Sequence, residues 1–190
     1  AIPVVTESYE VVIEAIRPTI VVDAILAKRN IGTTKSDASL VIGCGPGFNA
    51  GKDVHVVIET MRGHTLGRCI YEGPALANTG IPGNVGGYTH ERVIQSPAEG
   101  LFVAKCHIGD HIEAGAVIGY VGDVPVHAKI TGTLRGILAS KILVTKGFKL
   151  ADIDARCEES HCFTISDKAL AVGGGVMEAI TAWEYEQIKE

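Results

Sequence analysis

The sequence predicts a mixed fold in which an α/β unit is followed by a β-rich domain and a C-terminal helix. Two β-branched apolar runs, at residues 19–25 and 38–42, have the composition of buried parallel strands. A repeat punctuated by glycines follows at residues 97–154, and apolar residues at helical spacing come last. We therefore expect three segments, at residues 1–92, 93–155 and 156–190.

The composition of the chain argues against several classes of function. The chain has 46% hydrophobic and 21% charged residues, as globular proteins do, and a formal net charge of −5. The acidic balance argues against partners such as nucleic acid or an anionic membrane surface. No run reaches the roughly 20 apolar residues of a membrane span, and no signal-peptide pattern is present. Five cysteines in no regular framework then predict reduced thiols and a cytoplasmic protein.

The first elements form part of an α/β unit. A short helix is expected at residues 8–17, because its apolar spacing stops at Pro18. The two apolar runs then give strand, crossover and strand, with Asp23 at the carboxyl end of the first. Ligands of such sheets bind at the carboxyl ends of the strands, so this edge is the first place to expect a site.

A glycine-rich segment, residues 43–51, follows the second strand. Gly45, Gly47 and Gly51 are candidate cofactor-binding residues, since the segment from Gly45 matches GxGxxA, a loose dinucleotide-loop pattern. A Rossmann-type site would need a helix after this loop, whereas residues 53–60 have the pattern of another strand. The sequence therefore favours a tight glycine turn between two strands, with a cofactor loop as the alternative.

Cationic side chains are concentrated at residues 60–68. If Arg62, His64 and Arg68 alternate along a strand, they place cations on one face, which suits bidentate binding of a phosphate or carboxylate. The alternative, which the sequence favours, is a solvated edge with ordinary surface arginines. The three residues are kept as candidate cofactor-binding residues.

The repeat is the clearest organisational signal. Five positions recur at an offset of 32 residues: Gly100, Phe102, Ile112, Gly115 and Ile118 match Gly132, Leu134, Val144, Gly147 and Leu150. Both halves have the pattern of short strands joined by glycine turns, and neither can bury its apolar face alone. The pattern resembles the barrel-sandwich hybrid of biotinyl and lipoyl domains, and the preceding α/β unit is partly Rossmann-like.

Residues 167–169 spell Asp-Lys-Ala, the tripeptide that presents the modified lysine in lipoyl domains. The resemblance places that lysine on the hairpin between the two halves. Here the hairpin is residues 120–128, which contain no lysine, and Lys168 lies well beyond the second half. We therefore expect no covalent lipoate or biotin.

A helix is predicted after Ser166, a suitable N-cap, with Asp167 favourably placed in its first turn. Gly173, Gly174 and Gly175 interrupt its apolar pattern, and each glycine inside a helix costs about 1 kcal/mol relative to alanine. Either the helix starts afresh after them, or they permit close approach of a ligand or another backbone. We keep all three as candidate cofactor-binding residues.

The cluster Cys157-x3-His161-Cys162 offers at most three ligands where structural zinc needs four, so no metal site is predicted. Cys162, close to a predicted helix start where thiolate is favoured, is the candidate catalytic thiol. Burial as an inert core cysteine is the alternative. Because no complete catalytic constellation can be assembled from the sequence, it stays open whether the chain is an enzyme.

Four stretches together resemble the family of selenium-dependent molybdenum hydroxylase system proteins: VVDAILAKRN, GPGFNAGKDVHVVIETMRGH, NTGIPGNVGGYTHERVI and TISDKALAVGGGVMEAI. The resemblance spans essentially all 190 residues. It implies an accessory role in maturing a molybdenum hydroxylase, by inserting selenium or by handling a molybdopterin-type cofactor. Members usually begin with a further segment that carries a GxGD-type glycine loop, and we expect that segment to be missing here.

The resemblance also implies partners and site roles. The partners would be the hydroxylase, a selenium donor or both, and the oligomeric state stays open. Arg62, His64, Arg68 and the 45–51 loop would bind a phosphate of the cofactor, and Cys162 would handle the chalcogen. A noncatalytic docking scaffold is the alternative. A hydroxylase subunit comes last, because the chain is short and lacks the cysteine pattern of an iron–sulfur cluster.

Overall fold

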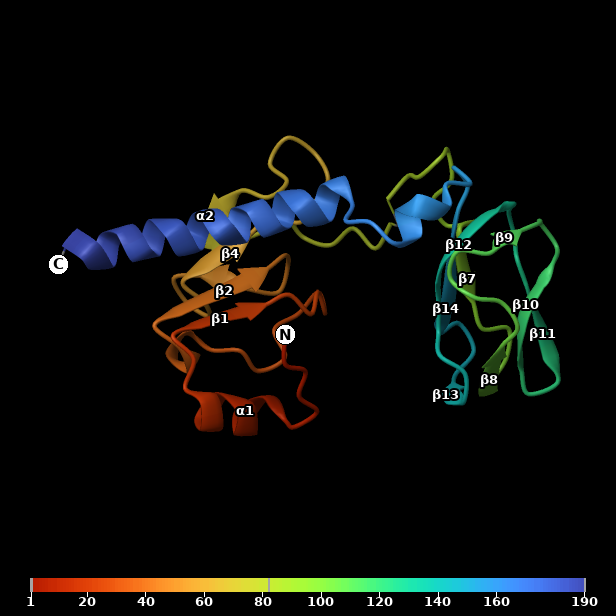
Figure 1. Cartoon of the computed structure of the whole chain (residues 1–190), viewed down its shortest axis with the longest axis horizontal. Coiled ribbons are helices and arrows are strands. Elements are labelled where there is room, and N and C mark those ends of the chain that lie inside the picture. Colours follow the sequence, from red (N-terminus) through yellow and green to blue (C-terminus); the bar gives the residue numbers. More distant parts are fainter. Residues whose placement is uncertain (1, 82, 190) are drawn as a thin grey trace. The chain divides into compact units, whose positions relative to one another are not determined.

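The chain forms two compact units in the computed structural model, which describes residues 2–81 and 83–189 (Figure 1). Unit 1 consists of Ala1–Thr79 together with Asp167–Glu190, and unit 2 is Gly80–Ser166. The segment expected at residues 156–190 is thus divided between the units: its helix belongs to unit 1 and its first residues belong to unit 2.

Unit 1 is built on a four-stranded sheet with the order β1-β2-β4-β5. Its strands are β1 (Ile20–Asp23), β2 (Leu40–Cys44), β4 (Val56–Ile58) and β5 (Cys69–Ile70). The first three are parallel, and β5 runs antiparallel to β4. The structure confirms the strands predicted from the β-branched runs, with shifted or shorter bounds.

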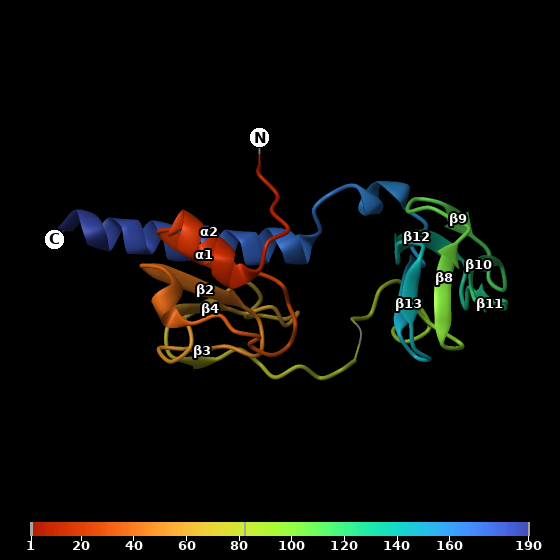
Figure 2. The same cartoon turned by 90° about the horizontal axis from the view of Figure 1, so that it is seen from below.

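Helices cover both faces of this sheet, as buried parallel strands require (Figures 1 and 2). Helix α2 (Asp167–Lys189) packs on the face that presents Leu40, Ile42 and Ile58. Helix α1 (Tyr9–Ile16) contributes Ile13 to the opposite face. Successive side chains of each strand point to opposite faces of the sheet, so the strands contribute to two separate apolar layers, one under each helix.

The connection after β2 is the tight glycine turn that the sequence favoured. Gly45 and Gly47 have φ angles of 88° and 110°, which only glycine adopts without strain. The turn leads into β3 (Asn49–Ala50), which pairs with β6 (Gly73–Pro74). The crossover from β1 to β2 contains a single 3-10 turn, η1 (Lys35–Asp37).

Unit 2 contains two four-stranded antiparallel sheets, ordered β11-β10-β8-β13 and β7-β14-β12-β9. In chain order the strands are β7 (Val93–Gln95), β8 (Gly100–Ala104), β9 (His111–Ile112), β10 (Val117–Val121), β11 (Val124–His127), β12 (Gly132–Ile137), β13 (Ile142–Val144) and β14 (Lys149–Asp154). A 3-10 turn, η2 (Glu159–Cys162), follows them.

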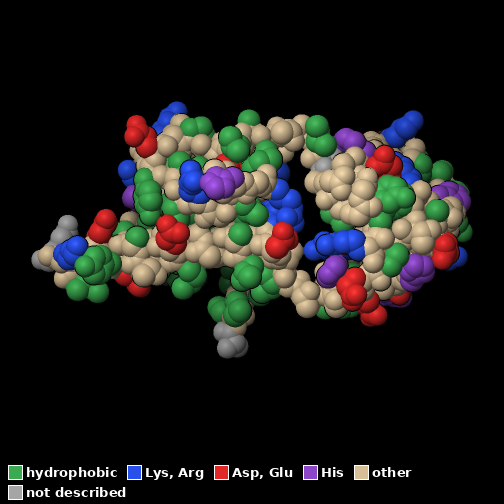
Figure 3. All heavy atoms as spheres, turned by 90° about the horizontal axis from the view of Figure 1, so that it is seen from above, with side chains coloured by type: hydrophobic (Ala, Val, Ile, Leu, Met, Phe, Trp, Pro, Cys, Tyr) green, Lys and Arg blue, Asp and Glu red, His purple; other side chains and the backbone are tan. Residues whose placement is uncertain are grey.

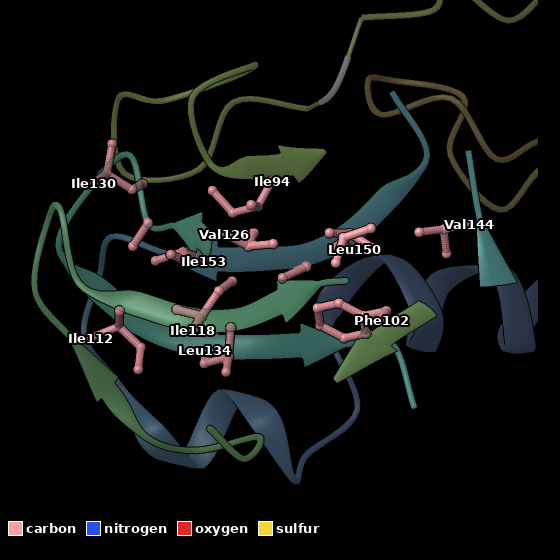
Figure 4. Close-up of a cluster of buried hydrophobic side chains, with 13 residues drawn as sticks. Ile94, Phe102, Ile112, Ile118, Val126, Ile130, Leu134, Val144, Leu150 and Ile153 are labelled. Atoms are coloured by element: carbon pink, nitrogen blue, oxygen red, sulfur yellow. The ribbon is translucent and has the colours of Figure 1, made fainter. Parts of the chain in front are cut away.

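The 32-residue repeat is visible in the strand pairing of unit 2. Gly100 pairs with Val144, and the equivalent residues one repeat away, Gly132 and Ile112, pair with each other. Every apolar position of the repeat is buried in one core (Figure 4): Phe102, Ile112, Ile118, Leu134, Val144 and Leu150. Each half therefore donates a strand to the sheet of the other, and the two share one interior.

Helix α2 runs without a break through its three glycines. The alternative in which the helix starts afresh after them is therefore wrong, and the second alternative, close approach of another backbone, holds for Gly175. A methyl group there would lie 2.1 Å from the carbonyl oxygen of Gly67. Methyl groups at Gly173 and Gly174 would meet nothing within 4 Å. Among the residues described, no helix is both long and apolar enough to span a membrane.

Candidate anion-binding site

The carboxyl ends of β1, β2 and β4 lie along one edge of the unit 1 sheet, because these strands are parallel. Three loops follow the strands at this edge, and glycines without side chains allow them to lie close together. A Cβ at Gly47 would lie 2.5 Å from the backbone of Arg29 in the loop after β1. A Cβ at Gly45 would lie 2.6 Å from Thr60 Oγ1 after β4. The glycine turn thus permits close contact among all three loops.

Asp23 ends β1 but is already engaged. Its carboxylate is 7% exposed and accepts hydrogen bonds from Thr33 Oγ1 at 2.7 Å and from the backbone N–H of Ile25 at 3.1 Å. Burial, together with the charge of Asp23, raises the pKa of the Cys44 thiol to about 11. Cys44 is therefore a protonated core thiol at physiological pH, and Asp23 shapes its loop.

Glu59 fixes the loop that follows β4. Its carboxylate is nearly inaccessible and accepts hydrogen bonds from the backbone N–H groups of Met61 (2.7 Å) and Leu76 (2.8 Å). The loop closes where Gly67 N–H donates to the Glu59 carbonyl at 2.9 Å. Two backbone N–H donors to the Glu59 carboxylate and the hydrogen bond from Gly67 therefore anchor this loop.

The cations at residues 60–68 do not alternate along a strand, so that part of the prediction is wrong. Gly63 and Gly67 adopt φ angles of 143° and 82°, which turn the backbone into a loop. Arg62, His64 and Arg68 are all exposed on that loop. Arg62 forms a bidentate ion pair with Asp167 at the start of α2, at 2.5 and 2.9 Å.

Lys168 is the cation that the sequence reasoning missed. Partial burial lowers the pKa of its ammonium group, the charges of Lys28 and Arg62 lower it further, and Glu59 opposes them. Three cations from three different segments are thus near one another: the loop after β1, the loop after β4 and the first turn of α2. We call Lys28, Arg62 and Lys168 the cation cluster. Lys28 could have been proposed from the sequence, because it closely follows the carboxyl end of a predicted strand, where ligands of such sheets bind.

The remaining candidate glycines have separate places. Gly51 closes its own turn after β3, where its N–H donates to the Val54 carbonyl at 2.9 Å. Gly175 packs on Gly67, whereas Gly173 and Gly174 face open space. Of the glycines predicted to bind a cofactor, Gly45 and Gly47 are the ones that the structure places at the carboxyl edge.

Cys162 belongs to unit 2 rather than to the start of α2. It is half-buried in η2, where its Sγ lies 3.7 Å from the Leu134 carbonyl oxygen. Beside it, the Nδ1 atom of His161 is buried and, in the described part of the chain, has no hydrogen-bond partner. The described residues contain no group of three or more His, Cys, Asp or Glu side chains able to hold a metal.

Asp154 organises the same region of unit 2. Arg156 binds it through Nε at 2.9 Å and Nη2 at 2.6 Å, and Arg135 lies 3.5 Å away. Hydrogen bonds from Arg156 are the main cause that lowers the Asp154 pKa to about 2, against the opposing effect of burial. This network joins the end of β14 to β12.

Comparison with known proteins gives the following relatives. No protein-family model matches the sequence. The chain is 46% identical over 188 residues to the uncharacterized protein YqeB of Escherichia coli (strain K12), which covers 99% of this chain and 35% of that protein. It is also similar to the crystal structure of an aspartoacylase family protein from Mesorhizobium loti, with 24% identity and a TM-score of 0.31 over 33% of this chain and 22% of that one. The chain thus spans about a third of the length of the curated relative that it matches.

Proposed function

We propose that this chain is an accessory protein in the maturation of a selenium-dependent molybdenum hydroxylase in the cytoplasm, and that unit 1 binds the phosphate of a molybdopterin-type cofactor at its carboxyl edge. The cation cluster is the observation that carries this proposal. Ligands of open parallel sheets bind at this edge, and clustered Lys and Arg side chains suit phosphate. The family resemblance supplies the cofactor class.

The mutual repulsion of the three cations favours binding of an anion among them. Lys28, Arg62 and Lys168 repel one another, which contributes to the lowered pKa of Lys168. A bound dianion would replace that repulsion with attraction, and the helix macrodipole at the start of α2 adds to the attraction. Glu59 and Asp167, which is paired with Arg62, set two negative charges against the three cations, so the cluster keeps one net positive charge.

For unit 2 we propose the barrel-sandwich hybrid fold, without a covalent arm, as a rigid docking module. The exchange of strands between two similar halves supports that fold. Lys168, the lysine of the lipoyl-like tripeptide, lies on α2 of unit 1. Cys162 would handle selenium or sulfur in this module, and unit 1 would be a Rossmann-like unit.

The test is equilibrium binding of isolated molybdenum cofactor, under anaerobic conditions, to the wild-type chain and to the Lys28→Ala and Lys168→Ala variants. Each loss of a cation should weaken binding about ten- to a hundredfold, as for a charge-assisted hydrogen bond of about 1.5–3 kcal/mol. Arg62→Lys tests the bidentate geometry while keeping the charge. Lys35→Ala is the matched control, since Lys35 precedes β2 at the opposite, amino edge. Equal binding by all variants would contradict the site.

A noncatalytic scaffold is the second candidate, and an exposed apolar row on unit 2 favours it. On the sheet that contains β8, Leu101 pairs directly with Leu143, and Val103 pairs with Tyr120. Leu101, Val103 and Leu143 are 47%, 45% and 73% exposed. If purified hydroxylase binds the chain and Leu143→Asp abolishes that binding while cofactor binding is absent, the scaffold is correct.

A further inference from the structure

Helix α2 has an apolar face on each side. Toward the sheet it packs Val172, Val176 and Ala179. The opposite side carries four large exposed side chains: Leu170 (69% exposed), Met177 (61%), Tyr185 (60%) and Ile188 (81%). Intervals of seven, eight and three residues keep these side chains on one side of a 3.6-residue helix. Figure 3 shows hydrophobic side chains beside the C-terminal end of this helix. We call the four residues, with Gly174 and Thr181 between them, the outer stripe.

Two glycines beside this stripe have no packing explanation within the described residues. Gly173 and Gly174 lie inside a continuous helix, where glycine is less favourable than alanine. Neither would meet an atom within 4 Å if it carried a methyl group. Position 175, by contrast, must be glycine, because a methyl group there would collide with the carbonyl oxygen of Gly67. These two glycines destabilise the helix, and no contact within the described residues requires them. We expect this combination where a surface outside the described residues approaches the helix backbone.

We propose that the outer stripe of α2 is the contact surface for a second copy of this chain, with the two α2 helices antiparallel about a twofold axis near residue 179. This axis places Leu170 opposite Ile188 and Met177 opposite Thr181 of the other copy. Gly174 then lies opposite Glu184 and next to Tyr185 of the other copy, so the missing side chain leaves room for the largest residue of the stripe. The stripe is complementary to itself, as an isologous interface requires.

Charge agrees with the antiparallel arrangement. The first turn of α2 contains Asp167 and Lys168, and Arg62 is bound there, which leaves one net positive charge. The last two turns contain Glu184, Glu186 and Lys189, which leaves one net negative charge. An antiparallel pair brings unlike ends together and also opposes the two helix macrodipoles. Two members of the cation cluster, Arg62 and Lys168, supply this positive end, so the charge argument applies to the chain without bound cofactor.

The test is sedimentation equilibrium across a wide range of chain concentration. The wild-type chain should be in concentration-dependent monomer–dimer equilibrium. Met177→Glu places two carboxylates close to the axis and should raise the dimer Kd at least a hundredfold, since like charges in an interface cost several kcal/mol. Gln187→Glu is the matched control, because it adds the same charge away from the stripe, and its Kd should stay unchanged.

Gly174→Ala separates the interface from a general effect on the helix. Alanine should raise the thermal midpoint of the monomer, because it favours the helix. It should also weaken the dimer, because the methyl group occupies the space of Tyr185. A wild-type chain that stays monomeric at high concentration would overturn the proposal. So would a dimer that tolerates Met177→Glu, or one that Gly174→Ala leaves unchanged or strengthens.

Discussion

Gly175 on α2 and Gly67 on the loop after β4 touch through backbone alone, since a methyl group at Gly175 would lie 2.1 Å from the Gly67 carbonyl oxygen. Gly175→Ala should therefore destabilise unit 1 by about 1–3 kcal/mol, the usual cost of overpacking. Gly173→Ala, a few atoms away in open space, should stabilise it by up to about 1 kcal/mol. Denaturant unfolding followed by the fluorescence of Trp183, a residue of α2 that packs against the sheet, measures both. Equal effects of the two substitutions would show that the helix does not lie this close to the loop.

His55 should make unit 1 sensitive to mild acid. Its Nδ1 accepts a hydrogen bond from the Val41 N–H at 3.0 Å, and burial is the main cause that lowers its pKa below the usual 6.5. The unfolded chain therefore binds the proton more readily than the folded one. This contribution to stability is present above pH 6.5 and is lost as the pH falls below it.

The pH dependence of unfolding tests this directly. The free energy of unfolding of the wild-type chain, followed by Trp183 fluorescence, should fall between pH 7.5 and pH 5.5. His55→Gln should have a smaller slope over the same range, whereas the exposed control His64→Gln should keep the wild-type slope. Identical slopes in all three proteins would contradict the role of His55.

Asp154 should account for most of the stability that unit 2 loses at acidic pH. Its pKa is lowered to about 2 from 3.8, and the difference corresponds to about 2 kcal/mol. That stability is present above pH 3.8 and is lost as the pH falls toward 2. Hydrogen exchange of β12 and β14, followed from pH 5 to pH 2.5, should show the loss. Asp154→Asn should flatten this dependence, and Asp123→Asn, on an exposed turn, should not.

The cysteines should react in an order set by burial and pKa. Cys157 is exposed, whereas Cys44 is 1% exposed and its pKa is raised to about 11. Brief alkylation with iodoacetamide at pH 8 should therefore label Cys157 first and Cys44 last, as mass spectrometry of the digested chain would show. Early labelling of Cys44 would mean that the layer between the sheet and α2 opens readily.

Local pattern was enough to predict most of the fold. The β-branched runs gave β1 and β2, and the offset of 32 residues located the core of unit 2, because burial repeats with the backbone path. The arrangement at residues 60–68 could not be predicted in this way. Arg62, His64 and Arg68 have a strand-like spacing, but Gly63 and Gly67 adopt left-handed backbone angles that no local pattern required.

The candidate site depended on contacts that are distant in sequence. Lys168 and Lys28 influence each other although the whole of unit 2 lies between them in the chain. Gly175 meets Gly67 across the same interval. A single sequence carries no signal for such pairs, so the lipoyl-like tripeptide drew attention to Lys168 for a different reason.

The split of unit 1 into two stretches has a consequence during synthesis on the ribosome. The strands β1, β2 and β4 emerge first, while α2 emerges only after all of unit 2 has been translated. Leu40, Ile42 and Ile58 therefore lack their cover for that whole interval. Unit 2 is one continuous stretch, so all of its residues are present once it has been translated, whereas unit 1 still lacks its last helix at that point. We expect the nascent chain to need a chaperone at this open layer, and to be prone to aggregation without one.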